Sequence, residues 1–216
     1  MTVYGELGVR TLINAKGPAT RLSGGIMRPE VAEAMADASQ ACVDIADLQA
    51  AASRLIAEAT GAEAGYVASG ASACLLIGAA ACITGLDPGK MARLPDTTGM
   101  KNECVMVRSQ RNFYDHAIRA AGLKIVEVGL PDRYAGAGVR DAEAWEIDDA
   151  ISERTACIFY VADAQSRPPL AEVTAVAHAR GIPVLVDAAA QLPPQDNLRR
   201  FISEGADLVA FSGGKA

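Results

Sequence analysis

Lys215 follows a strand-like apolar run and a pair of glycines, in the segment "DLVAFSGGKA". A lysine at the carboxyl end of a strand lies where α/β folds bind ligands, and Gly213 and Gly214 allow the backbone to approach a bulky group. An amine in such a place can form a Schiff base with a carbonyl compound when its pKa is lowered. The plain alternative is a solvated surface lysine, and this motif alone does not decide between the two.

Asp187 ends a second apolar run, in the segment "IPVLVDAAAQLPP". Burying a carboxylate is costly unless it has a cationic or hydrogen-bonding partner. One interpretation is an aspartate that keeps a pyridinium nitrogen protonated, so that a pyridoxal ring stays electron-poor. The other is an aspartate that caps the next helix.

A third motif has the order strand, Ser69-Gly70-Ala71-Ser72, long apolar helix. The backbone N–H groups and the dipole at the start of such a helix bind phosphate, and serine hydroxyls add donors. The motif is neither a Walker loop nor a dinucleotide fingerprint, and a simple serine N-cap is its alternative.

Short apolar runs alternate with helical patterns from Ala64 onward. Because the runs are apolar throughout, they are typical of strands covered on both faces, which predicts a mostly parallel sheet with helices on both faces, a three-layer α/β/α fold. The predicted strands are Ala64–Ala68, Cys104–Arg108, Lys124–Val128, Ala156–Ala162, Pro183–Asp187 and Leu208–Phe211. The predicted helices between them are Ser72–Ile83, Asn112–Ala121, Asp141–Ser152, Leu170–Arg180 and Asn197–Glu204.

The first sixty residues differ from the rest in pattern. A turn-rich start is followed by a helix that begins near Pro29 and by a second helix at about Asp47–Thr60. We therefore predict an N-terminal arm with helices over residues 1–60 and a ligand-binding large domain over residues 61–216.

Composition excludes several classes of function. The 216 residues are 50% apolar and carry a net charge of −6, which argues against a nucleic-acid surface. Five cysteines without CxxC spacing indicate reduced thiols, and with no signal peptide at Met1–Arg10 we expect a cytoplasmic protein. The most apolar stretch, Ala71–Ile83, is shorter than the about 20 residues that cross a bilayer. No His, Cys and Asp residues have the spacing of metal ligands.

The order of the three motifs resembles the large domain of fold-type I pyridoxal-phosphate enzymes, the aspartate-aminotransferase-like superfamily. The segments "INAKGPATRLSGG", "LPDTTGMKNE", "VDAAAQLPPQDNLRRF" and "GADLVAFSGGK" look like its bacterial selenocysteine-synthase-like branch, which includes D-glucosaminate-6-phosphate ammonia-lyase. The resemblance extends from about Gly5 to Lys215. It implies pyridoxal 5'-phosphate as cofactor and a homodimer or higher homo-oligomer.

The resemblance also assigns roles to residues. It implies that Lys215 forms the internal aldimine and that Asp187 pairs with the pyridine nitrogen. The phosphate would be lined by Ser69, Gly70 and Ala71, with Ser212 as a further donor. Gln110 stands where relatives place a ring-stacking residue, often a histidine. Candidates for binding a substrate carboxylate or phosphate are Arg21, Lys101 and Arg111, together with Arg108 and Arg167.

The implied reaction is that of a lyase acting on an amino acid or an amino-sugar acid. Lys215 would remove the α-proton, and loss of a β-substituent would give an aminoacrylate, then a keto acid and ammonia. A selenocysteine-synthase-like transfer on a charged tRNA is the first alternative, and the acidic chain lacks a basic arm for it. A non-catalytic remnant and an α/β module for another phosphorylated ligand are two more.

In the family the chain continues past the lysine into a further strand and a small C-terminal domain. We therefore expect either that this portion is a separate chain or that the sequence is a truncated product. Both histidines are left open: His178 is expected on the surface near a helix end, and His116 has a structural and a site interpretation.

Overall fold

The computed structural model describes residues 2–17, 19–22, 25–130 and 141–215, which form two compact units. One unit comprises Met1–Cys42 with Gly213–Ala216, and the other comprises Val43–Ser212. The boundary predicted between residues 60 and 61 does not coincide with this division, because the helix before it packs in the larger unit. Each unit is considered by itself below.

The smaller unit contains short helices joined by turns. Its main helix, α2 (Pro29–Ala38), begins at the proline that predicted it, with Arg28 as the preceding cap residue. Proline suits the first turn of a helix because it lacks only an N–H that would have no partner there. The other elements of this unit are α1 (Val3–Glu6), η1 (Thr20–Leu22) and η4 (Gly213–Lys215).

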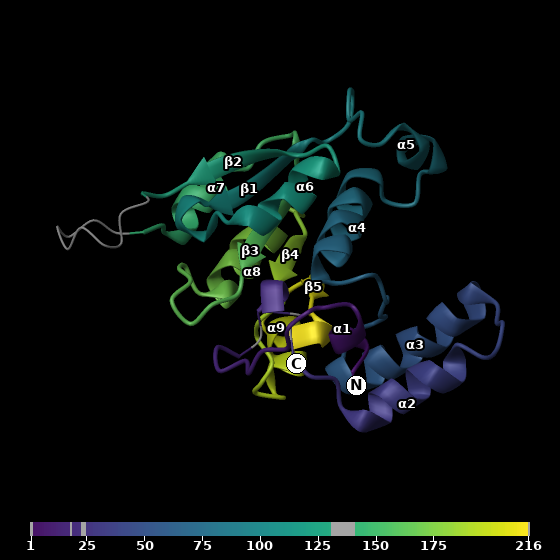
Figure 1. The fold of residues 1–216 in the computed structure, drawn as a ribbon. Coiled ribbons are helices and arrows are strands. Elements are labelled where there is room, and N and C mark those ends of the chain that lie inside the picture. Colours follow the sequence, from purple (N-terminus) through teal and green to yellow (C-terminus); the bar gives the residue numbers. More distant parts are fainter. Residues whose placement is uncertain (1, 18, 23–24, 131–140, 216) are drawn as a thin grey trace. The chain divides into compact units, whose positions relative to one another are not determined.

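The larger unit is built on one five-stranded parallel sheet, which Figure 1 shows with helices on both sides. The strand order is β2-β1-β3-β4-β5, and every neighbouring pair is parallel. The strands are β1 (Glu103–Val107), β2 (Lys124–Val128), β3 (Thr155–Val161), β4 (Val184–Asp187) and β5 (Leu208–Ala210). This confirms the predicted three-layer α/β fold and five of the six predicted strands.

Each face of the sheet has its own apolar core, because side chains alternate along every strand. On β3, Ile158 and Tyr160 face one core, whereas Cys157 and Phe159 face the other. The first core also takes residues from α7 (Ala144–Ala150), α8 (Leu170–Ala179) and α9 (Asn197–Ser203). The second takes residues from α4 (Ala71–Thr84) and α6 (His116–Ala120).

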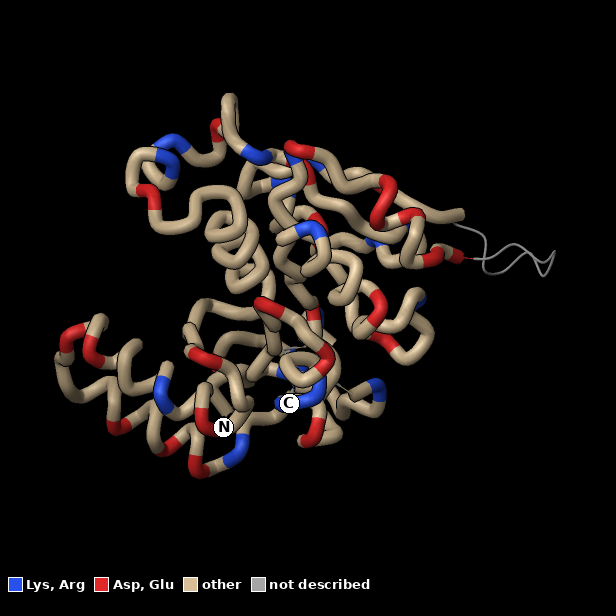
Figure 2. The backbone as a smooth tube through the Cα atoms, turned by 180° about the vertical axis from the view of Figure 1, so that it is seen from behind, with Lys and Arg blue, Asp and Glu red and all other residues tan. Residues whose placement is uncertain are grey.

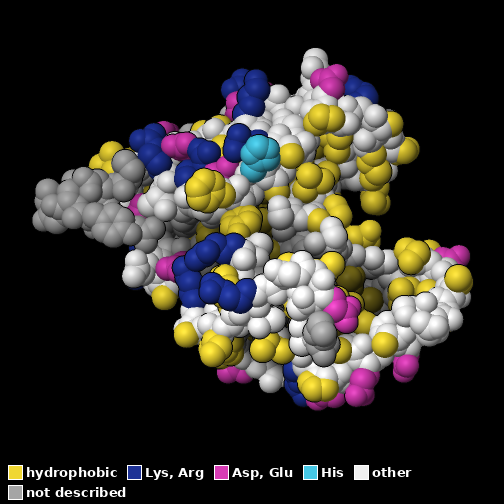
Figure 3. All heavy atoms as spheres, viewed as in Figure 1, with side chains coloured by type: hydrophobic (Ala, Val, Ile, Leu, Met, Phe, Trp, Pro, Cys, Tyr) yellow, Lys and Arg dark blue, Asp and Glu magenta, His cyan; other side chains and the backbone are white. Residues whose placement is uncertain are grey.

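α4 carries no charged residue over its 14 positions, and Figure 2 shows it as an unbroken tan helix. Leu75 and Ala79 are buried against the sheet, but Leu76 and Ile77 on the same helix are exposed. Figure 3 shows hydrophobic side chains gathered over α4 and the neighbouring α5 (Pro88–Arg93). A helix with apolar residues on all sides is usually covered on all sides in the assembled protein.

The predicted strand Ala64–Ala68 is wrong, since this segment forms no ladder with any described strand. Its backbone is instead held by a side chain of α3 (Ile45–Thr60): Gln49 donates from Nε2 to the Val67 carbonyl at 2.6 Å. The Val67 N–H donates back to Gln49 Oε1 at 3.1 Å. A side chain here takes the place of a strand partner, which strand propensity cannot reveal.

Helix bounds differ modestly from those predicted. The segment expected to be one helix at Asn112–Ala121 is split into η3 (Phe113–Asp115) and α6, and the turn before it is η2 (Arg108–Gln110). Within the described residues, no helix has both the length and the apolar character needed to span a bilayer.

Candidate active site

Asp187 ends β4 and is buried, with 7% of its surface exposed. The Ala189 N–H donates to its Oδ1 at 3.0 Å, and its backbone carbonyl accepts from the Ala162 N–H at 2.9 Å. Since all five strands are parallel, Asp187 lies at the edge where β1, β3 and β5 also end. The structure thus places a buried carboxylate at the carboxyl edge of the sheet, where α/β folds bind ligands.

The start of α4 lies at this same edge. Cys82, near the C-terminal end of α4, contacts Cys157, the third residue of β3. The negative charge of Asp207, which precedes β5, also acts on the Cys82 thiol. Gly78 packs on Leu185 of β4, where an added Cβ would lie 3.1 Å from Leu185 Cδ1. α4 therefore runs opposite to the strands, and at about 1.5 Å per residue Ala71 lies about 10 Å from Gly78 toward the carboxyl edge.

The first turn of α4 is open to an anion. Gly70, its N-cap residue, has φ 124° and ψ 170°, a conformation that side chains with a Cβ rarely adopt, and no side chain caps the helix. The first N–H groups of a helix have no partner within it, and the helix dipole makes them attractive to negative charge. The start of α4 is therefore able to accept an anion, and the phosphate role of Ser69, Gly70 and Ala71 stays a prediction.

Gln110 is buried at the end of η2, directly after β1. Its Oε1 accepts from the Val161 N–H at 2.9 Å, and its Nε2 lies 3.5 Å from the Arg167 carbonyl oxygen. Val161 is the last residue of β3 and is the register partner of Asp187. The carboxamide of Gln110 is thus tied to the backbone between β1 and β3, a role that the predicted stacking on a cofactor ring does not include.

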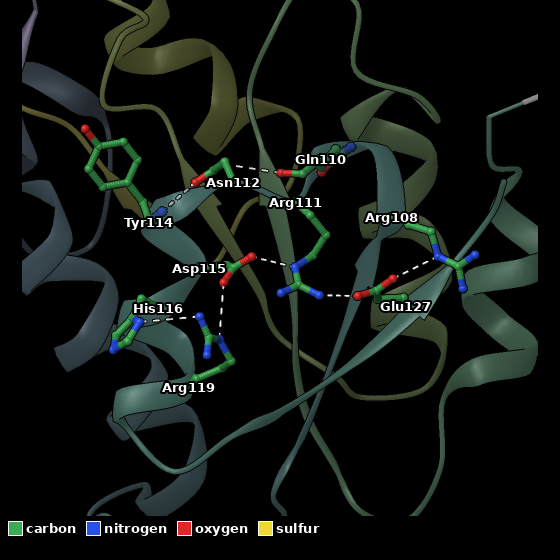
Figure 4. A network of polar contacts seen from close by, with 9 residues as sticks. All are labelled: Arg108, Gln110, Arg111, Asn112, Tyr114, Asp115, His116, Arg119 and Glu127. Atoms are coloured by element: carbon green, nitrogen blue, oxygen red, sulfur yellow. Dashed lines mark hydrogen bonds and ion pairs between the residues drawn. The ribbon is translucent and has the colours of Figure 1, made fainter. Parts of the chain in front are cut away.

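A chain of ion pairs fixes the segment around Gln110 (Figure 4). Glu127 on β2 pairs with Arg108 at 2.8 Å and with Arg111, and the Arg111 Nε also lies 2.5 Å from Asp115 Oδ2. Arg119 pairs with the other oxygen of Asp115 at 3.3 Å. Alternating charges of this kind hold the turn that carries Gln110 between β2 and α6.

Charge attraction outweighs burial at the centre of this chain of ion pairs. Burial acts to raise the pKa of the Asp115 carboxyl, but hydrogen bonds and attraction from Arg111 and Arg119 lower the pKa below its usual value. The hydrogen bond to Asp115, with the nearby Glu127, raises the pKa of Arg111. Because the guanidinium of Arg111 is already held by two carboxylates, the prediction that it binds a substrate anion loses its support.

Lys101 lies far from Asp187 within the larger unit. It precedes β1 and therefore lies at the amino edge of the sheet, whereas Asp187 lies at the carboxyl edge. A five-residue strand spans about 16 Å, which is more than a lysine side chain can bridge. The linear sequence concealed this, because it does not show which end of a strand a loop adjoins in space.

Arg167 lies at the carboxyl side of β3, where its exposed side chain donates to the Ser166 carbonyl at 2.8 Å. With Trp145 and Glu172 it lines an open hollow of about 480 Å³. Among the five predicted anion-binding side chains, Arg167 and Arg108 are thus both at the carboxyl side of the sheet within the larger unit. Arg21 lies in η1 of the smaller unit.

Ser212 and Lys215 fall on either side of the division between the units. Ser212 is the last residue of the larger unit, two residues beyond β5, and Lys215 ends η4 of the smaller unit. The convergence of Lys215 with Asp187 therefore stays a prediction. It is consistent with chain length, since three residues after Ser212 span at most about 10 Å.

Gln191 lies in the turn that follows Asp187, and the sequence analysis did not single it out. It follows β4 by four positions, and its Nε2 donates to the Ala162 carbonyl at 2.7 Å. Nothing in its sequence context, between apolar and proline residues, distinguishes it from an ordinary turn residue.

The two histidines have ordinary surroundings. His178 is on α8, and its Nε2 lies 2.9 Å from Asp207 Oδ2, at the amino edge of the sheet. His116 is exposed at the start of α6, with its Nδ1 3.4 Å from an Arg119 nitrogen. The surface interpretation of His178 is thus confirmed, with an aspartate as an added partner.

The chain was compared with known proteins, and no family model matches it. It is 37% identical to D-glucosaminate-6-phosphate ammonia lyase of Salmonella typhimurium over 99% of the chain, which covers 57% of that protein. It is 35% identical to 5'-C-glycyluridine monooxygenase-decarboxylase of a Streptomyces species, over 98% of the chain and 53% of that protein. To L-seryl-tRNA(Sec) selenium transferase of Rhizobium meliloti it is 29% identical, over 74% of the chain and 34% of that protein.

The fold agrees with the sequence matches. A solved structure of D-glucosaminate-6-phosphate ammonia-lyase superimposes with a TM-score of 0.90 over 100% of this chain, at 37% identity. The match covers 57% of the solved chain, so this chain spans just over half the length of the relatives it matches. The resemblance predicted from the sequence is confirmed.

Proposed function

This chain is a relative of D-glucosaminate-6-phosphate ammonia lyase over 99% of its length, and from that relationship we propose that it is the cofactor-binding part of a pyridoxal-phosphate lyase. The observation that carries the proposal is the buried carboxylate of Asp187 at the same sheet edge as the uncapped start of α4. A carboxylate and an open helix N-terminus at one edge suit a ligand with a ring nitrogen and a phosphate.

When bound, pyridoxal phosphate supplies an electron sink for the electron pair left on the substrate's α-carbon after proton removal. In the proposed site, Asp187 accepts a hydrogen bond from the protonated ring nitrogen. The N–H groups after Gly70 and the hydroxyls of Ser69 and Ser212 hold the phosphate. Lys215 would hold the cofactor through its amine, and the same amine would move the substrate's α-proton.

The substrate class that we propose is an amino acid or an amino-sugar acid with a leaving group at its β-carbon. Removing the α-proton and expelling that group gives an aminoacrylate, which water hydrolyses to a keto acid and ammonia. Arg108 and Arg167, at the carboxyl side of the sheet, are the described candidates for the substrate's anionic groups. They take the place of Lys101, which lies at the opposite edge.

A transferase acting on charged tRNA is the second candidate, and the 29% identity to a selenium transferase favours it. The net charge of −6 weighs against it, because a tRNA-binding surface needs basic side chains. We further propose a cytoplasmic homo-oligomer, supported by the five unpaired cysteines and by the exposed apolar side of α4.

Cofactor binding is the first test. Purified protein is mixed with pyridoxal phosphate, the visible absorbance is recorded, and borohydride is added to fix any covalent bond before mass mapping. We expect a visible band and a reduced adduct on Lys215, both lost in Lys215→Ala and kept in Lys101→Ala, the matched lysine at the far edge. A Lys215→Ala protein that behaves like the parent would falsify the cofactor assignment.

Turnover is tested separately, by measuring ammonia and keto acid from a panel of amino acids and amino-sugar acids. The chain alone and the chain supplemented with the C-terminal part of a relative are compared, because the matched relatives are longer. Release of ammonia from either sample supports the lyase. A stable cofactor band without product from any substrate in either sample supports the non-catalytic alternative.

A further inference from the structure

Asp187 belongs to a ring of hydrogen bonds that joins the turn after β4 to the end of β3, and the side chain of Gln191 completes this ring. The Ala162 N–H donates to the Asp187 carbonyl at 2.9 Å, and the Ala162 carbonyl accepts from Gln191 Nε2 at 2.7 Å. The Gln191 N–H then donates to the Ala188 carbonyl at 3.0 Å. The turn that leaves Asp187 is thus folded back onto the end of β3 by the carboxamide of Gln191.

The backbone of Gln191 is itself held in place. Asn197, which is buried at the start of α9, donates from Nδ2 to the Gln191 carbonyl at 2.7 Å. Gln191 is therefore fixed by Asn197 on one side and by Ala188 on the other. With its backbone fixed, the carboxamide of Gln191 extends to the end of β3 and donates to the Ala162 carbonyl.

The orientation of the Asp187 carboxylate depends on this turn. Its Oδ1 accepts from the N–H of Ala189, which lies between Asp187 and Gln191 in the same turn. If the turn loosens, the Ala189 N–H moves and the carboxylate loses this hydrogen bond. A carboxylate that has to hydrogen-bond to a ring nitrogen needs a fixed position, because small displacements weaken such a contact steeply.

We propose that Gln191 is the positioning residue for Asp187, acting through the end of β3 and the Ala189 N–H. Gln110 braces the same strand end from the opposite side, since its Oε1 accepts from the Val161 N–H. This inference rests on the proposed function in one respect, that Asp187 binds a ring nitrogen. The hydrogen bonds of Gln191 that hold the turn are present in the protein without cofactor.

The first experiment needs no cofactor. Hydrogen–deuterium exchange at the Ala162 and Ala189 amides is measured by NMR in the parent, in Gln191→Met and in Gln195→Met. Methionine keeps the size of glutamine but cannot donate to the Ala162 carbonyl, and Gln195 is an exposed glutamine four positions later. We expect the two amides to exchange at least about ten-fold faster in Gln191→Met only. Parental exchange rates in Gln191→Met overturn the proposal.

The second experiment uses the cofactor-loaded protein. The pH at which half of the visible band is lost is measured, together with the dissociation constant of pyridoxal phosphate, with Asp187→Asn as the reference for a lost carboxylate charge. We expect Gln191→Met to shift the pH midpoint in the same direction as Asp187→Asn and to weaken binding about ten-fold, with Gln195→Met at parental values.

The outcomes separate the two hypotheses. Faster exchange with an unchanged pH midpoint and unchanged affinity overturns the positioning role and leaves only a structural brace. A parent protein that forms no visible band overturns the proposed function, while the exchange data still decide whether Gln191 orders the turn at Asp187. A lower melting temperature shared equally by Gln191→Met and Gln195→Met, without faster exchange, also counts against the proposal.

Discussion

The sulfur atoms of Cys104 and Cys157 lie 3.7 Å apart, on neighbouring strands β1 and β3 where the two residues are register partners. Both residues are fully buried, and Cys82 of α4 hydrogen-bonds to Cys157 from above the sheet. Three thiols thus meet inside the core that joins α4 to the sheet. The contact with Cys104 and burial raise the pKa of Cys157, although the contact with Cys82 acts against them. The contact with Cys157 and burial raise the pKa of Cys82.

Thiol labelling should therefore be strongly selective. The thiolate is the reactive form, so a buried thiol with a raised pKa reacts slowly, whereas Cys42 is exposed. In the native protein at pH 8, we expect a maleimide to label Cys42 first and to leave Cys104 and Cys157 unmodified, with all five labelled in urea. Peptide mass mapping measures this, and equal labelling of Cys157 and Cys42 in the native protein would contradict the packing of the second core.

The ion pairs of Asp115 should stabilise the protein in a pH-dependent way. Its carboxylate is 3% exposed and pairs with both Arg111 and Arg119, so Asp115→Asn should lower the free energy of unfolding by about 1–3 kcal/mol at pH 7. Urea denaturation measures this loss. Arg28→Gln, which removes an exposed arginine paired with Glu30, is the control and should change stability by less than about 1 kcal/mol.

The direction of the pH dependence follows from the lowered pKa of Asp115. Near and below the usual aspartate pKa of about 3.9, the native state binds fewer protons than the unfolded chain, so stability rises with pH there. The contribution is complete above that value and is lost as the pH falls through the lowered native pKa. The difference between parent and Asp115→Asn should therefore shrink at acid pH, and a constant difference from pH 7 to pH 3 would count against the ion pairs.

Two adjacent leucines of α4 provide a test of its orientation. Leu75 is 1% exposed and packs in the second core, whereas Leu76 is 38% exposed. We expect Leu75→Ala to lower the free energy of unfolding by about 2–5 kcal/mol. Leu76→Ala should cost well below about 1 kcal/mol in a monomer. Urea denaturation checks both, and equal losses would mean that α4 does not face the sheet as described.

Two glycines that end helices separate backbone strain from steric clash. Gly181 (φ 66°) has open space where a Cβ would stand, but at Gly122 (φ 104°) a Cβ would lie 2.4 Å from the Pro95 carbonyl oxygen. Gly181→Ala should cost about 1–2 kcal/mol from its backbone conformation alone. Gly122→Ala should cost clearly more in the same denaturation measurement, and a smaller loss at Gly122 would contradict the close approach of the 95–97 loop.

The fold was largely readable from the sequence because its signals are local. Apolar runs such as Val184–Asp187 predict buried parallel strands, and glycines such as Gly181 mark helix ends. The one wrong strand, Ala64–Ala68, has the same local signal. It fails because a strand also needs a partner, and Gln49, eighteen residues before Val67, supplies the hydrogen bonds instead.

The residues of the candidate site were also predictable from the sequence only in part. Residue type and spacing were enough to single out Asp187, the loop at Gly70 and Lys215, since a costly buried charge and a helix start are visible in one dimension. Which end of a strand a side chain adjoins is not visible there, and only the structure puts Lys101 at the amino edge, away from Asp187. The ion pairs of Arg111 are hidden in the same way, because its partners Asp115 and Glu127 come together only in the folded chain.

By itself, the sequence determined the chemical groups and the layered α/β scaffold, because both depend on residue type and on short-range periodicity. Only the tertiary structure decided which groups share an edge, which charges are already neutralised and how Gln191 reaches Ala162. The physical reason is that hydrogen bonds and ion pairs act over about 3 Å in space. Residues that are far apart along the chain reach that distance only when the sheet and its helices have formed.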